Sequence, residues 1–591
     1  METSLPAEPP TPAESSSVLP PPEKFLRGYL GHALLYGRAT DRVRKAKARI
    51  GLTIAVFVII FGVIATRLVM FATAPEKHGG PRAAQERMAA TRPDILDRNG
   101  QILATDINAP SLFAEPRKLL DVDEAVEFLT AVLPDLDAME LRDRLSTRRG
   151  FVWLKREIGA KQAKEIRRYG IPGVGFMPEN RRVYPNNAEV SHIIGYVNVD
   201  NQGMAGIEKW LDASGLAALH LVGLATDRLQ KPVDLALDLR IQHALRAELV
   251  AAAEKYKSIA AAGIISDVRT GEVVAMVSLP DYDPNNPRQA IDPQRLNRLT
   301  NGVFELGSTY KALTVAMALD SGKVTLNSSF DARQPLQYGK FTIDDFHGQR
   351  RILTVPEIFT YSSNIGTAKM ALSLGVEYHK AFLRKLGQLD RLRTEVPESA
   401  EPLYPKQYWG EINTATIAFG HGLSVSPLQA VMAINALVNG GYLIPPTFLK
   451  RSEAQARELA VRVVKPQTSD AMRYLMRLNV EKGTATRAEV KGYYVGGKTG
   501  TSEKVVDGRY SKHKVLNTFT AVLPADQPRY LILIMLDEPQ ATPETNGNDT
   551  AGWNAAPTAA KVIARVAPML GLKPRDDLPS SERLILARGG R

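Results

Sequence analysis

The stretch Leu306-Gly307-Ser308-Thr309-Tyr310-Lys311 stands directly before the apolar run 312–319. If a helix begins near Ser308, the i, i+3 spacing places the Ser308 hydroxyl and the Lys311 amine on one face, one turn apart. A serine becomes a nucleophile when a base takes its proton, and a lysine serves as that base where burial or a second cation lowers its pKa. Alone, S-x-x-K is weak, because about one or two chance occurrences are expected in a chain of this length. The alternative is a serine at a helix start followed by a solvated lysine.

The bulk composition limits the classes of protein that fit. With 591 residues, 44% of them hydrophobic and 23% charged, the chain is long enough for a membrane anchor and two or more folded domains. The net charge of +12 is dispersed, and its densest cluster, at 38–49, adjoins an apolar segment, which favours a membrane over nucleic acid as the partner. The chain has no cysteine, which excludes disulfides, thiolate metal sites and cysteine nucleophiles.

One segment is apolar enough to span a bilayer. Residues 50–65 carry no charge, and with 68–71 the segment reaches the ~20 residues that a spanning helix needs. We therefore predict a cytoplasmic, disordered and basic tail over 1–49 and a transmembrane helix over 50–71, with the rest of the chain outside the cytoplasm. A cleaved signal peptide is the alternative, because Ala72-Thr73-Ala74 has the A-x-A form, but the tail is long for an n-region.

The sequence beyond the anchor predicts a first folded part over 75–230. A strand, a tight turn at Asn99-Gly100 and a second strand are followed by helical patterning around 121–147. No catalytic cluster stands out in this α+β part, so we interpret it as a pedestal, a spacer or docking module.

A second folded part is predicted over 231–572, with a loose polar tail over 573–591. A helix through Lys257 precedes a hairpin, the middle of the segment is mostly helical, and strands return over 487–537. A sheet built from distant segments of the chain is therefore expected.

Two further clusters decide between the readings of Ser308. Ser362-Ser363-Asn364 lies in a turn-prone stretch, and Lys498-Thr499-Gly500-Thr501 follows much later. The ordered set S-x-x-K, S-x-N and K-T-G is the signature of penicillin-binding proteins and serine β-lactamases. The segment from Gly492 also matches the phosphate-binding P-loop, but polar residues follow the lysine where a P-loop opens an amphipathic helix, so we disfavour a nucleotide site.

From Arg92 to about Leu570 the sequence resembles class B penicillin-binding proteins, the bitopic peptidoglycan D,D-transpeptidases. Further segments that carry the resemblance are Asp97-Arg98-Asn99-Gly100, 182–185, 192–197, 203–208, 270–276, 419–422, 427–429 and 439–441. The segment 553–557 and the helix that follows resemble the division-specific, FtsI-type members of alphaproteobacteria. Pro93 and Leu306 stand where the family usually has Gly and Pro.

The resemblance implies an α+β fold: a single N-terminal transmembrane helix, an elongated α+β pedestal similar to the class B dimerisation domain, and a transpeptidase domain similar to serine β-lactamases. That domain is an antiparallel sheet flanked by helices, with an all-helical subdomain. The implied location is the bacterial inner membrane, with one span, a cytoplasmic N-terminus and a periplasmic catalytic domain.

Chemistry and resemblance together assign roles to the motif residues. Ser308 attacks the D-Ala-D-Ala carbonyl and Lys311 is the base. Lys498 lowers the pKa of Lys311 and helps to hold the substrate carboxylate, while Ser362 relays a proton to the leaving amine. Asn364 orients the substrate and Lys311. Substrate binding is assigned to Thr499, Gly500 and Thr501, and the oxyanion hole to the backbone N–H groups of Ser308 and Thr501.

The predicted function is cross-linking of stem peptides at the division septum through a serine acyl-enzyme, without metal or cofactor. The expected partners are peptidoglycan stem peptides, β-lactams, the membrane, an FtsW-type glycosyltransferase and other divisome proteins, but not nucleic acid. Two alternatives stay open: an elongation-specific transpeptidase of the same family, and a catalytically idle scaffold for cell division.

Overall fold

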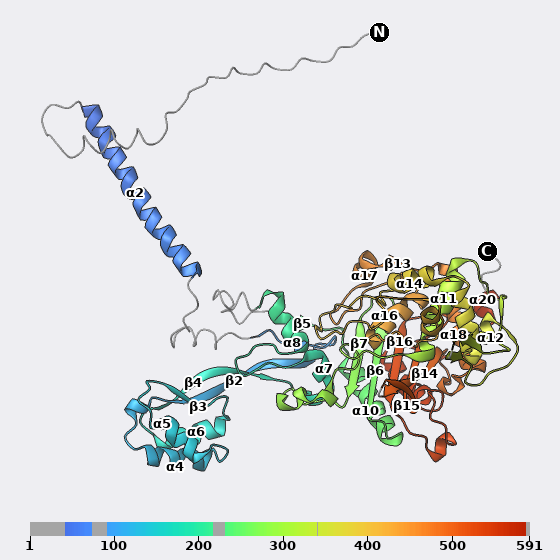
Figure 1. Ribbon diagram of the computed structural model, residues 1–591. Helices are drawn as coiled ribbons and strands as arrows, with labels where there is room; N and C mark the ends of the chain where they lie inside the picture. The colour runs from blue at the N-terminus through green and yellow to red at the C-terminus, as the bar shows by residue number, and fades with distance from the viewer. Residues whose placement is uncertain (1–41, 74–91, 217–230, 340, 507, 587–591) are drawn as a thin grey trace, which may run out of the picture. The chain divides into compact units, whose positions relative to one another are not determined.

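The computed structural model describes residues 42–73, 92–216, 231–339, 341–506 and 508–586 (Figure 1). The chain divides into two compact units, Met1–Ala84 and Gln85–Arg591. Each unit is described by itself.

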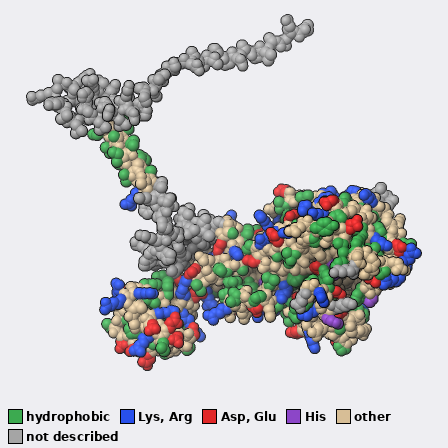
Figure 2. Space-filling model, in the orientation of Figure 1, with side chains coloured by type: hydrophobic (Ala, Val, Ile, Leu, Met, Phe, Trp, Pro, Cys, Tyr) green, Lys and Arg blue, Asp and Glu red, His purple; other side chains and the backbone are tan. Residues whose placement is uncertain are grey.

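In the first unit, the described residues form one long helix, α2 (Arg42–Thr73). The window Ile50–Arg67 has a mean hydropathy of 2.3 and none of it is buried, and Figure 2 shows hydrophobic side chains along it. In the described part of the chain, this is the one helix long and apolar enough to cross a membrane. The predicted span lies within α2. Most of the predicted disordered tail lies outside the described residues, but its last part, 42–49, is helical, so the prediction of disorder is wrong there.

The pedestal is built on the long strand β2 (Ile102–Ala114). Its neighbours are β1 (Ile95–Leu96), β3 (Val152–Lys155) and β4 (Val174–Val183), all antiparallel to it, and β5 (Val233–Asp234) pairs in parallel with β1. Leucine and isoleucine side chains from the helices pack beside β2 and β3. These helices are α4 (Val122–Val132), α5 (Ala138–Leu145) and α6 (Ala160–Tyr169), and the short α7 (Ser191–Ile194) and α8 (Gly206–Leu211) follow.

The tight turn predicted between the first two strands is confirmed. Asp97 accepts hydrogen bonds from the backbone N–H groups of Asn99 and Gln101, at 2.7 and 2.8 Å, and Gly100 has a φ of 81° that glycine adopts without strain. Asp97 also accepts from the N–H of Leu239, the first residue of the next domain's helix, at 3.1 Å. The turn therefore joins the pedestal to the domain that follows it.

A buried ion cluster fixes the start of the pedestal. Glu208 is fully buried and pairs with Arg92 at 2.8 Å and with Arg182 at 2.7 Å. Arg182 also donates to the carbonyl of Pro93 at 2.8 Å. Proline keeps its carbonyl, so the departure from the family's usual glycine leaves this contact available.

The second domain is organised around a five-stranded antiparallel sheet in the order β14-β15-β16-β6-β7 (Figure 1). The strand β16 (Tyr530–Asp537) is buried along its length, and its side chains alternate between two cores. Ile532 and Ile534 face α10 (Leu239–Lys255) and α19 (Ala555–Met569), while Leu533 faces the other helices. The remaining strands are β6 (Ala260–Asp267), β7 (Val273–Leu279), β14 (Gly496–Val506) and β15 (Arg509–Leu523).

The middle of the domain is mainly helical, as predicted, with small two-stranded pieces between the helices. The helices are α11 (Lys311–Ser321), α12 (Val355–Tyr361), α13 (Asn364–Leu372), α14 (Val376–Lys385), α15 (Glu411–Ile417), α16 (Pro427–Val438), α17 (Glu453–Leu459) and α18 (Pro466–Lys482). The short strands are β8 (Ser329–Asp331), β9 (Leu336–Tyr338), β10 (Phe341–Ile343), β11 (Ile352–Thr354), β12 (Tyr442–Leu443) and β13 (Val461–Arg462).

The expectation of a loose C-terminal tail is wrong for its described part. The N–H of Arg575 donates to the carbonyl of Gly492 at 2.8 Å, and that of Ser581 donates to Glu481 of α18 at 2.9 Å. A short helix, α20 (Arg583–Leu586), follows. The tail is polar, but its backbone has partners on the domain surface.

Candidate active site

The predicted nucleophile lies in a tight turn rather than in the helix. A 3₁₀ turn spans Gly307–Tyr310, and α11 begins at Lys311. The turn packs closely on β14, because a Cβ atom at Gly307 would lie 2.7 Å from the Thr501 carbonyl oxygen. Ser308 is half-buried, and in the described part of the chain no hydrogen bond occupies its hydroxyl. Leu306 is buried in the core, so the departure from proline is accommodated by packing.

Ser362 lies between two helices in an unusual backbone conformation. It ends α12 with φ 59° and ψ 43°, in the left-handed region that a residue with a Cβ rarely adopts. Asp345 holds this connection: its carboxylate accepts from the Ser363 hydroxyl at 2.8 Å and from the Ile365 N–H at 2.9 Å. Such strain persists where neighbouring contacts determine the geometry. Asp345 was not predicted, because nothing in its local sequence places it beside Ser363.

Two buried lysines meet at the Ser362 hydroxyl. Lys311 Nζ and Lys498 Nζ each lie 3.0 Å from Ser362 Oγ, and both lysines have no exposed surface. Lys311 Nζ also donates to the Ser362 carbonyl, and Lys498 Nζ to the Thr499 carbonyl at 3.1 Å. The three predicted motifs are therefore brought together by side chains from α11, the α12–α13 connection and β14.

The environment favours neutral amines at this point. Burial lowers the pKa of Lys498 to about 7. Burial also lowers the pKa of Lys311 well below its usual range, and the nearby Lys498 lowers it further, while Asp345 opposes the shift. A neutral lysine amine beside a serine can accept its proton.

The Lys498 motif lies on an edge strand of the sheet. Because Lys498 is inside β14 and does not open a helix, the segment lacks P-loop geometry. The Thr499 hydroxyl is hydrogen-bonded to that of Thr484 at 2.7 Å, whereas the Thr501 hydroxyl accepts from the Ala551 N–H at 3.1 Å. The Thr501 hydroxyl therefore keeps its proton available for a ligand.

Asn364 differs from the prediction in one respect. Its side-chain amide donates to the Asp344 carbonyl at 2.8 Å. The predicted hydrogen bond to Lys311 is not present among the described residues, where the Lys311 amine is directed to Ser362 instead. Asn364 is half-buried at the start of α13, two residues after Ser362.

The comparisons with known proteins agree with this arrangement. The family described as penicillin binding protein transpeptidase domain matches residues 261–564, and the penicillin-binding protein dimerisation domain matches residues 87–215. This chain is a class B penicillin-binding protein. Both matched segments lie in the unit that carries the pedestal, the antiparallel sheet and the three motifs.

Relatives of this penicillin-binding protein cover most of its length. It is 40% identical over 497 residues to the probable peptidoglycan D,D-transpeptidase FtsI of Caulobacter vibrioides, with 82% of each chain covered. It is 30% identical over 528 residues to the peptidoglycan D,D-transpeptidase FtsI of Escherichia coli, covering 84% of this chain and 87% of that protein. The crystal structure of a peptidoglycan synthetase from Bifidobacterium adolescentis shares the fold, with a TM-score of 0.64 and 22% identity over 83% of this chain and 97% of that chain.

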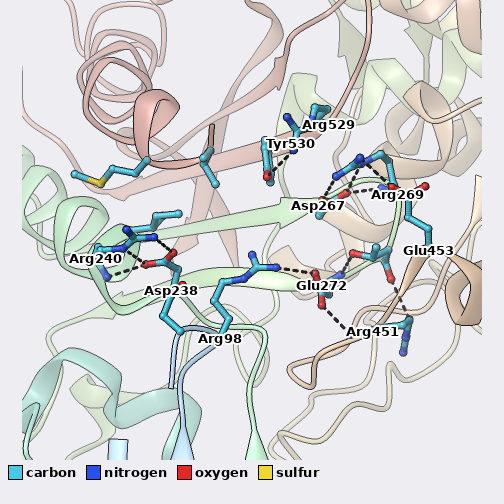
Figure 3. Close-up of a pocket in the computed structure, with 15 residues that line it drawn as sticks. Arg98, Asp238, Arg240, Asp267, Arg269, Glu272, Arg451, Glu453, Arg529 and Tyr530 are labelled. Atoms are coloured by element: carbon cyan, nitrogen blue, oxygen red, sulfur yellow. Dashed lines mark hydrogen bonds and ion pairs between the residues drawn. The ribbon is translucent and has the colours of Figure 1, made fainter. Parts of the chain in front are cut away.

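A cavity of about 420 Å³ lies at the junction with the pedestal, and none of the predicted site residues lines it (Figure 3). Arg98, from the pedestal turn, pairs with Glu272 of the transpeptidase domain at 3.3 Å. Each of the four carboxylates around the cavity contacts an arginine; the other pairs are Asp238 with Arg240, Asp267 with Arg269, and Glu453 with Arg269. Of these ion pairs, the Arg98–Glu272 pair connects the two domains, and we assign all of them a structural role.

Proposed function

We propose that this penicillin-binding protein is a septal peptidoglycan D,D-transpeptidase that works through an acyl-enzyme on Ser308. The observation that carries the proposal is the meeting of Lys311 and Lys498 at Ser362 Oγ, each at 3.0 Å. This arrangement supplies a desolvated base three residues along the chain from the predicted nucleophile Ser308, and acyl transfer requires such a base.

In the proposed first half-reaction, Ser308 Oγ attacks the carbonyl carbon of the penultimate D-Ala, and Lys311 takes the hydroxyl proton. The tetrahedral oxyanion is stabilised by the N–H groups of Ser308 and Thr501. The bond to the terminal D-Ala then breaks, and its amine receives a proton through Ser362. Lys498 and Thr501 hold the substrate carboxylate, with Thr499 and Gly500 forming the adjoining strand and Asn364 orienting the peptide.

In the second half-reaction, an amine on a neighbouring stem peptide attacks the acyl-enzyme. Lys311 and Ser362 carry its proton back to Ser308 Oγ, which leaves as the new amide forms. β-Lactams resemble the D-Ala-D-Ala end, so they acylate the same serine. The D-Ala of the substrate departs, whereas the opened lactam stays attached to the serine as a bulky group.

We also propose that the N-terminus lies in the cytoplasm and the transpeptidase domain in the periplasm. The basic cluster at 38–49 before the apolar part of α2 supports this orientation. The domain boundaries near 75 and 231 belong to the same proposal. The pedestal and α2 are the surfaces that we propose for an FtsW-type glycosyltransferase and other divisome proteins.

Complementation of a depleted strain tests the function and its two alternatives. We expect depletion to block septation and give filamentous or branched cells, and expect the wild-type gene but not Ser308→Ala to restore division. Ser146→Ala, an exposed serine of the pedestal, is the matched control. Rescue by Ser308→Ala would indicate a scaffold, and loss of side-wall growth would indicate an elongation enzyme.

A further inference from the structure

Glu305, three residues before the predicted nucleophile, joins three separate elements. Its Oε1 accepts from the backbone N–H of Gly422 at 2.8 Å. The Tyr510 hydroxyl donates to the same carboxylate, 3.1 Å from Oε1 and 3.2 Å from Oε2. Glu305 leads into the Ser308 turn, Gly422 belongs to the loop after α15, and Tyr510 is the second residue of β15, in the β14–β15 hairpin. We call this set of three residues the clasp.

The loop that contains Gly422 touches the nucleophile turn directly. A Cβ atom at Gly420 would lie 2.0 Å from the Gly307 carbonyl oxygen, so only glycine allows this approach. The His421 ring stands edge-on to the Tyr510 ring, with 5.4 Å between centroids. The loop and the hairpin therefore meet beside the turn that presents Ser308.

The charge of Glu305 is balanced by hydrogen bonds alone. Among the described residues it forms no ion pair with a lysine, arginine or histidine. Burial raises the pKa of Glu305, while the Gly422 N–H and the Tyr510 hydroxyl lower it. A partly buried carboxylate without a neighbouring cation destabilises the folded state unless hydrogen-bond donors surround it. The Gly422 N–H and the Tyr510 hydroxyl are therefore held in contact with Glu305.

Core packing does not account for the Tyr510 contact. Tyr510 keeps 47% of its surface exposed, and it lies beyond the β-bulge at Glu503/Lys504, where the hairpin leaves the regular sheet. The hydrogen bond from the Tyr510 hydroxyl to Glu305 thus orients the tip of the β14–β15 hairpin beside the site. A contact of this kind fixes geometry more than it adds buried area.

We infer that Glu305 is a positioning residue, which clasps the β14–β15 hairpin and the 419–422 loop against the Ser308 turn and so sets the width of the substrate cleft. The inference rests on the proposed function, since it assigns a role in donor-substrate binding to the transpeptidase cleft. The first strand of the same hairpin, β14, carries Lys498 and Thr501, which we propose to hold the substrate carboxylate. Release of the hairpin tip should weaken the non-covalent complex with the substrate or penicillin more than it slows the acylation step, because pre-organisation of the binding site is lost.

Stopped-flow acylation by a fluorescent penicillin, at several penicillin concentrations, separates binding from chemistry. Tyr510→Phe removes one hydroxyl and keeps the ring beside His421. We expect it to weaken the non-covalent complex about tenfold, the scale of one hydrogen bond to a charged group. The first-order acylation rate constant and the melting temperature should stay close to those of the wild type. Tyr408→Phe, an exposed tyrosine outside the clasp, is the matched control and should change neither quantity.

Coupling gives a second criterion. In a double-mutant cycle, Tyr510→Phe should add nothing to Glu305→Ala, and Glu305→Gln, which keeps one acceptor oxygen, should restore part of the binding. Wild-type binding by Tyr510→Phe, or additive effects in the cycle, would overturn the inference while leaving the proposed function intact. A wild-type protein that penicillin does not label would overturn the proposed function itself, and the inference with it.

Discussion

Ser362 Oγ lies 3.0 Å from the amine of Lys498. The amine of Lys311 reaches the same oxygen at 3.0 Å, so one hydroxyl joins two lysines that have no exposed surface. Two lysine amines that share one hydrogen-bond partner, away from water, repel each other strongly when both are charged. The site therefore favours states in which at least one amine is neutral, and this is the electrostatic basis of the proposed acylation.

The first prediction concerns stability as a function of pH. Burial lowers the pKa of Lys498 from the ordinary 10.5 to about 7, so above pH 7 the unfolded chain binds this proton and the folded chain does not. The free energy of unfolding should therefore rise with pH between about pH 7 and 9, by about 1 kcal/mol per pH unit for one such lysine. Urea unfolding at several pH values measures it. A Lys498→Met variant with the same slope as the wild type would contradict the prediction.

The second prediction concerns Ser362. Removal of its hydroxyl in Ser362→Ala takes away the one acceptor that both lysine amines share, and with it the proposed proton relay. We expect the acylation rate with penicillin to fall by about 10²- to 10³-fold, within the range of lost acid–base catalysis. Ser373→Ala, an exposed serine at the end of α13, is the control. Equal acylation rates in the two variants would remove Ser362 from the mechanism.

The third prediction concerns Asp345, which fixes the left-handed conformation of Ser362 through Ser363 and Ile365. Asp345→Ala leaves two donors without their acceptor, so we expect a loss of about 1 to 3 kcal/mol in stability and slower acylation. Asp345→Asn keeps one acceptor oxygen and should recover part of both. The control is Asp344→Asn, whose carboxylate forms an exposed ion pair with Arg350. An Asp345→Ala protein as stable and as fast as this control would contradict the prediction.

The fourth prediction concerns the buried cluster of the pedestal. Glu208→Gln removes the buried charge that faces Arg92 and Arg182, and breaking a buried pair typically costs about 3 to 5 kcal/mol. This range is an upper bound here, because Arg92 keeps Asp212 and Arg182 keeps Asp106 as partners. Glu140→Gln breaks only an exposed pair with Arg144 and should cost less than about 1 kcal/mol. Chemical unfolding measures both. Similar losses in the two variants would show that the cluster does not hold the pedestal.

The sequence predicted the parts of the site that local patterns carry. Ser308 and Lys311, Ser362 and Lys498 are recognisable because they stand in short motifs of residue types that acyl transfer needs. The structure brings Lys311, Ser362 and Lys498 together, while the role of Ser308 stays a prediction. The Asn99-Gly100 turn was likewise predictable, since its hydrogen bonds join neighbours in the chain.

What the sequence could not predict depends on contacts between distant segments. Asp345 and Glu305 are ordinary acidic residues until folding brings Ser363 and Tyr510 to them. The sequence also failed to predict that the C-terminal tail is held on the domain surface, because the contact of Arg575 with Gly492 joins distant segments. The pKa of Lys498 also had no local signal, because burial is its cause.

The central claim is that Ser308 is the residue that becomes acylated. Purified protein treated with a fluorescent penicillin, digested and analysed by mass spectrometry, tests it most directly. We predict one adduct per chain on the peptide that contains Ser308, and none in Ser308→Ala, with Ser146→Ala labelled like the wild type. Persistent labelling of Ser308→Ala, or an adduct on another peptide, would contradict the account.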